Sequence, residues 1–236
     1  MLVAFIAGLI RGFSGFALSA VGMAGAALVL PPAQLIPVLW WMEFFASVLM
    51  LRGGWRDADR KVSIGLTIGS AVGFPLGLTL TLIMLPDTSR LVALALICVL
   101  AASQLRKLKL SFLATTPGLY GSGVLAGIAT GLAGVGGMVV ALYVLARNAP
   151  AAQMRGSLVL YLAMTSVVSF TILVSTGTMD GTAFTRGLFF AIPCTFGVWL
   201  GTKLFVPKWE PYYKPFCLCL LIGLAAFGIF RLVFLG

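Results

Sequence analysis

Long apolar segments, separated by short stretches that carry nearly all of the charge, dominate this chain of 236 residues. They lie near residues 2–30, 33–51, 62–85, 91–105, 112–146, 156–175, 187–206 and 216–235. Most of them have about the length that a helix needs to cross a bilayer, roughly 20 residues. Charged residues make up only 9% of the chain, whereas a soluble domain has about 25%. The sequence therefore predicts an all-α polytopic membrane protein, and it excludes a soluble enzyme and a disordered protein.

The first and fifth segments are too long for one crossing, and each has a glycine-rich break near its middle. The breaks are Gly12–Gly15 and Gly131–Gly137. Two structures are compatible with such a segment. Either it is one long tilted helix, or it folds back on itself as a hairpin of two shorter helices.

The two breaks belong to an internal duplication. Ala7–Gly15 matches Ala126–Gly134, which lies 119 residues later, and Gly73–Gly77 matches Gly197–Gly201 after an insertion. The first segment thus has a counterpart inside the chain, so we expect it to belong to the mature protein rather than to a cleaved signal peptide. Two halves with one plan are expected in a single integral membrane domain. They are a first repeat at 1–105 and a second repeat at 112–236, joined by a basic linker at 106–111.

The basic residues of the loops favour the hairpins. Lys and Arg number 16 against 6 Asp and Glu, a net charge of +10, and they lie at the ends of apolar segments rather than in a nucleic-acid-binding patch. If both long segments fold back, all basic loop residues gather on one side except Arg90, Arg186 and Arg231. A single crossing divides them more evenly, against the enrichment of cytoplasmic loops in Lys and Arg. Corresponding loops also differ in charge between the halves. We therefore expect two inverted repeats, each a broken-helix hairpin plus three transmembrane helices, with both termini outside.

The breaks and their surroundings resemble the sulfite exporter TauE/SafE family, also called the toluene-sulfonate uptake permease family. The resemblance rests on Gly12–Phe16 followed by Leu30–Pro32, and on Gly131–Gly137 followed by Leu145–Pro150. Through the duplication it extends over essentially the whole chain. It implies secondary transport of small sulfur-containing anions such as sulfite and sulfonates, often outward. The first break lacks the fuller Gly-Gly-Gly form, because Phe16 and Ala17 follow Gly15.

Both breaks are candidates for binding an anion. A half-helix that starts at Ser14 or Gly134 would point its N-terminal N–H groups and its positive dipole end into the protein. Glycine also lets the backbone approach a ligand closely. The alternative is that these glycines only allow tight helix packing. The backbone donors expected at the substrate are those of Ser14, Gly15, Phe16, Gly134, Val135, Gly136 and Gly137.

Two charged residues lie within apolar segments. Arg11 precedes the first break, and we expect it to bind the substrate anion, although it can instead extend to a nearby interface. Its guanidinium fork suits an oxyanion. Glu43 either balances the charge of Arg11 or carries a coupling proton. Candidate hydroxyls of the cavity are those of Ser19, Ser47, Thr165 and Ser166, each of which can also bond to its own helix.

The expected function is transport of an anion at a midplane site by alternating access, with export as the expected direction. A channel or a non-transporting assembly subunit is the alternative. A membrane enzyme is disfavoured, because the chain has no histidine and no carboxylate pair; no catalytic residue, cofactor or metal site is expected, and the four cysteines lack metal-binding spacing. The expected partners are the small anion and membrane lipid, not nucleic acid, with a homodimer as one option. The expected location is the bacterial inner membrane.

Overall fold

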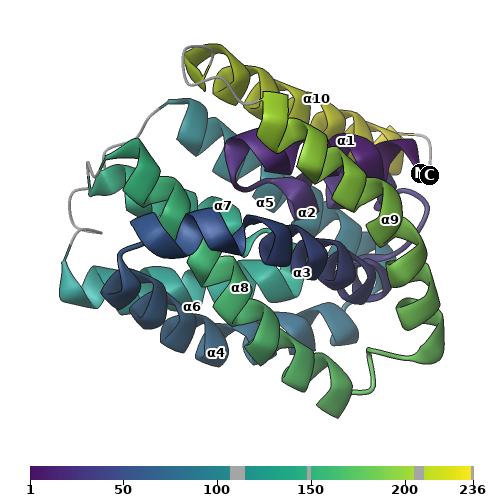
Figure 1. Cartoon of the computed structure of the whole chain (residues 1–236). Helices are drawn as coiled ribbons and strands as arrows, with labels where there is room; N and C mark the ends of the chain where they lie inside the picture. Colours follow the sequence, from purple (N-terminus) through teal and green to yellow (C-terminus); the bar gives the residue numbers. More distant parts are fainter. Residues whose placement is uncertain (107–114, 148–149, 205–209, 235–236) are drawn as a thin grey trace.

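The computed structural model describes residues 1–106, 115–147, 150–204 and 210–234 (Figure 1). Every regular element in this part of the chain is an α-helix. The predicted linker 106–111 lies outside the described residues except for Arg106. The helices are α1 (Leu2–Ser14), α2 (Leu18–Ala26), α3 (Pro32–Asp57), α4 (Arg60–Ile83), α5 (Pro86–Leu105), α6 (Thr116–Ala133), α7 (Gly136–Ala146), α8 (Ala151–Ser175), α9 (Gly181–Leu204) and α10 (Glu210–Phe234).

Five of the described helices are long and apolar enough to cross a membrane: α3, α4, α5, α8 and α9. Their outward faces carry large apolar side chains, such as Ile68 and Val72 on α4 and Ile192 and Phe196 on α9, all more than half exposed. Apolar side chains on the outside are expected where lipid replaces water. The predicted all-α polytopic membrane fold is therefore confirmed.

Both long apolar segments are broken, but the second helix of each begins later than predicted. α1 ends at Ser14 and α2 begins at Leu18, whereas α6 ends at Ala133 and α7 begins at Gly136. The prediction that the half-helices start at Ser14 and Gly134 is wrong. The reason is that Gly15 (φ 78°) and Gly134 (φ 71°) take the left-handed conformation, which ends the preceding helix and is accessible to glycine at little cost.

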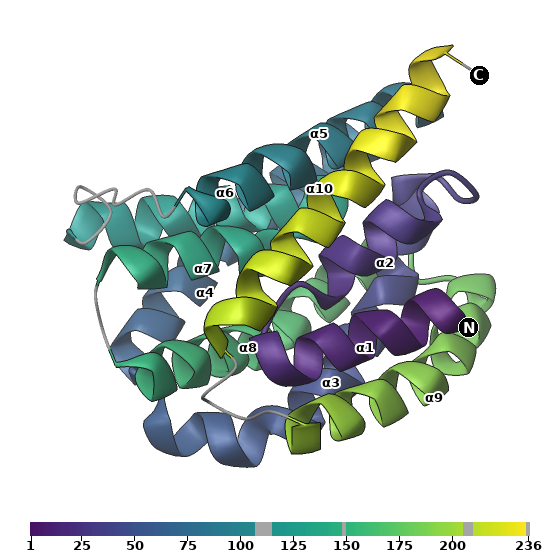
Figure 2. The ribbon, with the colours of Figure 1, turned by 90° about the horizontal axis from the view of Figure 1, so that it is seen from above.

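The first broken segment folds back on itself. A Cβ placed on Gly25, near the end of α2, would lie 2.8 Å from a methyl carbon of Val3, near the start of α1. α2 therefore returns alongside α1, as Figure 2 also shows. This is the hairpin arrangement rather than one long tilted helix.

Helices of one half pack on helices of the other half. α1 packs on α9, and α6 packs on α4, so the first helix of each half contacts a late helix of the other. These two pairs lie on opposite sides of the crossing helices α3 and α8 (Figure 1), and α5 lies beside α10 (Figure 2). Swapping the halves converts the α1–α9 pairing into the α4–α6 pairing, and it converts the α5–α10 and α3–α8 pairings into themselves. A twofold relation between the repeats predicts this pattern.

Glycines lie at both of these contacts between the halves, α4–α6 and α1–α9. A Cβ on Gly73 of α4 would lie 2.1 Å from the carbonyl oxygen of Val124 of α6, and a Cβ on Gly12 of α1 would lie 2.5 Å from that of Val198 of α9. Small residues allow such close backbone approach between helices in membranes. Glycine packing is therefore real in this fold, and it positions α1 and α6, the helices that end at the breaks.

Candidate functional site at the two helix breaks

The two breaks meet in the interior. A Cβ on Gly134 would lie 3.4 Å from the Cβ of Ser19, at the start of α2. A Cβ on Gly137, at the start of α7, would lie 3.9 Å from the Cβ of Phe16 in the first break. Each break thus touches the beginning of the other half's short helix. Segments that are far apart in sequence form one site.

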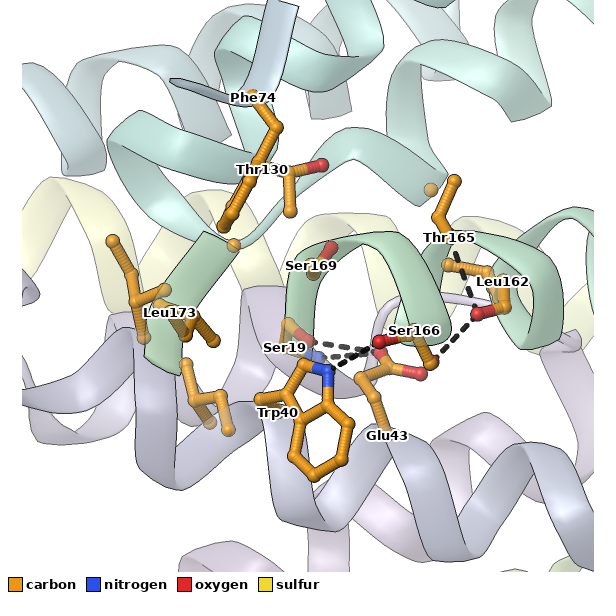
Figure 3. A pocket seen from close by; sticks show the side chains of 14 residues that line it. Ser19, Trp40, Glu43, Phe74, Thr130, Leu162, Thr165, Ser166, Ser169 and Leu173 are labelled. Atoms are coloured by element: carbon orange, nitrogen blue, oxygen red, sulfur yellow. Dashed lines mark hydrogen bonds between the residues drawn. The ribbon is translucent and has the colours of Figure 1, made fainter. Parts of the chain in front are cut away.

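A pocket opens beside this contact, with about 490 Å³ of empty space including the part that is open to the surroundings. Figure 3 shows Phe74 and Thr130 on one side of it and Trp40 and Glu43 on the other. Both halves contribute to its wall. The lining residues are Ser19, Ile36, Leu39, Trp40, Glu43, Phe74, Thr130, Gly134, Gly137, Leu162, Thr165, Ser166, Ser169 and Leu173.

A smaller cavity adjoins this pocket and shares Phe74, Thr130, Thr165 and Ser169 with it. It extends to Ser70 on α4, whose hydroxyl lies 2.7 Å from that of Tyr161 on α8. Hydroxyl groups therefore continue from the pocket between α4, α6 and α8. Phe74, Gly127 and Val168 complete the lining, so the wall of the smaller cavity is partly apolar.

The N-terminus of α7 faces the pocket. Gly136 and Gly137 are its first two residues, and N–H groups in the first turn of a helix have no carbonyl partner within that helix. Gly137 lines the pocket. Only glycine fits at position 136, because a Cβ there would lie 2.1 Å from the Thr130 hydroxyl oxygen. The backbone donors and positive dipole end of α7 are thus available to an anion.

The N-terminus of α2 already holds an anionic group. The Glu43 carboxylate accepts hydrogen bonds from the Ser19 hydroxyl at 2.9 Å and from the Ser19 backbone N–H at 3.4 Å. Its other oxygen lies 3.4 Å from the Arg11 guanidinium. The structure therefore brings Arg11, Ser19 and Glu43 together; we call these three residues the Glu43 cluster.

Arg11 lies behind Glu43 and is completely buried. It does not extend to an interface. Besides Glu43, it donates to the carbonyl oxygen of Gly15 and to the hydroxyl of Ser47 at 3.4 Å. Arg155 of α8 donates to the Gly12 carbonyl at 2.7 Å. Two guanidinium groups thus satisfy carbonyls at the C-terminal end of α1, where the helix dipole favours positive charge.

The backbone donors of the first break are used internally. The Gly15 N–H donates to the Arg11 carbonyl at 2.9 Å, and the Phe16 N–H donates to the Ser14 hydroxyl at 3.3 Å. The Ser14 hydroxyl in turn donates to the Phe16 carbonyl. The first break is therefore a self-satisfied turn. The second break is one too, because the N–H groups of Gly134 and Val135 donate to the Thr130 and Ala129 carbonyls.

The expected hydroxyls are placed differently from one another. Ser19 and Ser166 line the pocket, as does Thr165. Thr165 and Ser166 donate to carbonyls of their own helix, at 2.8 Å and 2.7 Å. Ser47 lies away from the pocket wall, against Arg11. The two interpretations offered for these residues hold together, because a hydroxyl can bond to its helix and still line the cavity.

Of the residues expected at the substrate, only some reach the pocket wall. Those that do are Ser19, Glu43, Gly134, Gly137 and Ser166. Those that lie behind or beside the wall are Arg11, Ser14, Gly15, Phe16, Ser47, Val135 and Gly136. The sequence reasoning missed Trp40, whose indole N–H donates to the Ser166 carbonyl at 2.9 Å.

Comparison with known proteins gives one clear match. The model of the family described as "Sulfite exporter TauE/SafE" matches residues 1–228. No curated protein and no solved structure matches the chain.

Proposed function

The chain belongs to the sulfite exporter TauE/SafE family, and from this premise we propose that it is a secondary transporter that exports small sulfur-containing anions such as sulfite or sulfonates. We place it in the bacterial inner membrane as a multi-pass protein. The transported anion binds at the pocket between the two broken helices. Alternating access to that pocket moves the anion across the membrane.

The observation that carries this proposal is the pocket itself. In a chain of which 61% of residues are hydrophobic, residues of both halves and the N-terminus of α7 converge on one cavity that reaches Ser19, Glu43 and Ser166. Helices are broken inside membranes only where the freed backbone groups face protein or a wet cavity. Half-helix N-termini that point at an anionic solute are the recurring device of secondary transporters.

We assign binding of the anion to two kinds of group: backbone N–H groups at the start of α7 and the Arg11 guanidinium. The N–H group of Gly137 holds the anion at the pocket wall, with the N–H group of Gly136 beside it, and the guanidinium of Arg11 supplies the positive charge behind the wall. The expected hydroxyl partners are Ser19 and Ser166. The remaining residues of the breaks, Ser14, Gly15, Phe16, Val135 and Ser47, fix the geometry of these donors.

The packing of the halves supports alternating access over a static channel. α1 and α6 each pack on a helix of the opposite half through glycines, so a movement of one half against the other shifts both breaks. A channel or a non-transporting assembly subunit is the second candidate. A channel would conduct anions at rates far above those of a carrier and would show no exchange of internal for external anion.

The membrane potential suffices to drive export of a monoanion. An anion that leaves a cell with a negative interior gains about 2.3 kcal/mol per 100 mV. Glu43 then needs only to balance Arg11, from which it lies 3.4 Å. The other role for Glu43 is that of a proton carrier. Methanesulfonate, which stays ionised at neutral pH, separates the two: a pH gradient at zero potential drives its uphill movement only if the protein couples protons.

The function is tested by anion flux into proteoliposomes. Sulfite and methanesulfonate should move in vesicles that contain the wild type. Gly137→Leu should stop the flux: the atoms nearest to a Cβ at this position are side-chain atoms at 3.6 Å or more, so the residue fits, and its added branch fills the pocket. Gly121→Leu is the matched control, since nothing lies within 4 Å of its Cβ position. Equal flux in both variants would refute the pocket as the transport site, and absence of flux in the wild type would refute the function.

A further inference from the structure

The Glu43 carboxylate is held as a bound oxyanion would be held. One oxygen accepts from the backbone N–H and hydroxyl of Ser19, in the first turn of α2, and the other faces the Arg11 guanidinium at 3.4 Å. A helix N-terminus, a hydroxyl and a guanidinium are the donors that proteins use for anionic ligands. The first half thus has a complete anion site, and a side chain of the protein occupies it.

The second half lacks this arrangement. All three residues of the Glu43 cluster have uncharged counterparts 119 residues later, so the shared fold does not require the cluster. The counterparts are Thr130, Met138 and Leu162. Leu162 lines the pocket at the position where the first half has a carboxylate. Position 162 therefore supplies no carboxylate to the N-terminus of α7.

Glu43 separates the pocket from Arg11. The Glu43 side chain is 15% exposed and lines the pocket, whereas Arg11 is fully buried and does not. An anion in the pocket therefore meets the carboxylate first. It reaches the guanidinium only when Glu43 moves aside.

The ion pair is incompletely satisfied. Arg11 Nε is buried and donates no hydrogen bond among the described residues, and the Glu43 oxygen nearest Arg11 accepts none. A guanidinium that serves only as a structural partner of a carboxylate commonly uses two parallel N–H donors. Here one buried donor is left over, and buried donors without partners disfavour the arrangement that leaves them so. The pair is thus suited to being opened by a better ligand.

We propose that Glu43 is an internal anion that occupies the first-half anion site in the empty protein, and that the transported anion must displace it to reach Arg11. This inference rests on the proposed transport function. Displacement sets the affinity of the site: Glu43 competes with the substrate for the same donors, and its return expels the substrate. Without this competitor the anion would bind more tightly and leave more slowly.

The test is the binding of methanesulfonate to the purified full-length protein. Glu43→Gln keeps the shape of the side chain and removes its charge, which leaves Arg11 buried without a counter-ion. The dissociation constant of methanesulfonate should fall by about 10- to 100-fold. The reason is that the bound anion neutralises Arg11 and so recovers part of the free energy that was lost with the carboxylate partner. Methanesulfonate should also raise the melting temperature of Glu43→Gln more than that of the wild type.

Two controls assign the gain to Arg11. In the double variant Arg11→Gln, Glu43→Gln the gain should disappear, because no buried charge remains to be neutralised. Asp87→Asn removes a carboxylate from an exposed pair with Arg90, so it changes the net charge equally and should bind methanesulfonate as the wild type does. If Glu43→Gln folds only in the presence of methanesulfonate, that rescue is itself the expected gain.

Three results would overturn the inference. One is an unchanged or weaker affinity in Glu43→Gln, another is the same gain in the double variant, and the third is a Glu43→Gln protein that stays unfolded at every methanesulfonate concentration while the double variant folds. If the wild type still transports anions in any of these cases, the proposed function stands and only the role of Glu43 fails. If the affinity gain is found but the wild type does not transport anions, the site is real and the transport function fails.

Discussion

The contact between α4 and α6 offers a prediction whose magnitude follows from the structure. A Cβ on Gly127 of α6 would lie 2.5 Å from the carbonyl oxygen of Ser70 and 2.7 Å from the backbone nitrogen of Phe74, both on α4. These atoms belong to backbone within a helix and cannot rotate away. Gly127→Ala must therefore push the two helices apart by several tenths of an ångström.

Two losses add up in this variant. Overpacking of a tight contact costs about 1–3 kcal/mol. Separation of the helices also weakens the bonds from the Ser70 hydroxyl to the Gly123 carbonyl (2.9 Å) and from the Thr81 hydroxyl to the Gly131 carbonyl (2.8 Å), each worth about 0.6 kcal/mol in a membrane protein. Alanine also gains helix propensity of up to about 1 kcal/mol, so the expected net loss in free energy of unfolding is about 1–3 kcal/mol.

Reversible unfolding in mixed micelles measures this loss, with Gly121→Ala as the control. Gly121 lies on the same helix with nothing within 4 Å of its Cβ position, so alanine there gains only the helix propensity, about 1 kcal/mol at most. The anion flux of Gly127→Ala should fall too, because α6 carries Thr130 and is followed directly by Gly134, and both residues line the pocket. If the two variants were equally stable, the close approach of α4 and α6 would be refuted.

Three further predictions concern topology, binding and the loop between α3 and α4. A reporter that is active only in the cytoplasm should stay silent when fused after Gly236, because both termini are expected outside; a bright signal would contradict the fold-back topology with both termini outside. Arg11→Lys and Arg11→Gln should each weaken methanesulfonate binding by about tenfold or more in folded protein, measured by calorimetry, since neither side chain offers the guanidinium fork. Asp59→Asn should lower the free energy of unfolding by less than about 1 kcal/mol, because its 3.3 Å pair with Arg147 is partly exposed and asparagine still caps α4. A larger loss in the same micelle assay would contradict this and show that the ion pair contributes substantially to stability.

Much of the fold could be predicted from the sequence because membrane helices are constrained by length and apolar composition. The two breaks, the duplication and the order of the helices follow from glycine placement and segment length. The boundaries do not: α3 continues to Asp57 and α5 begins at Pro86, outside the apolar segments 33–51 and 91–105. Helices extend past the apolar part of their sequence wherever the next residues still form helix, and hydropathy does not detect this.

The site was harder to predict than the fold. The sequence identified Arg11 and Glu43 as the intramembrane charges, and they lie 3.4 Å apart. It did not show that Glu43 rather than Arg11 lines the pocket, because that depends on which side of α3 faces the break. Nor did it identify the contact of Arg155 with the Gly12 carbonyl, since these residues are far apart in the chain and no local pattern connects them.

The two halves differ at their anion sites, and this difference favours binding of one anion rather than two. Two equivalent helix N-termini on one cavity would invite two anions. Two unit charges about 6 Å apart repel by about 3 kcal/mol at an effective dielectric constant of 20, so a second bound anion would be weakened by roughly a hundredfold. Glu43 instead fills the start of α2 and is balanced by Arg11, while the start of α7, beside the apolar Leu162, remains open. The empty pocket is then neutral at the first half and attractive at the second, which favours entry of one anion at a time.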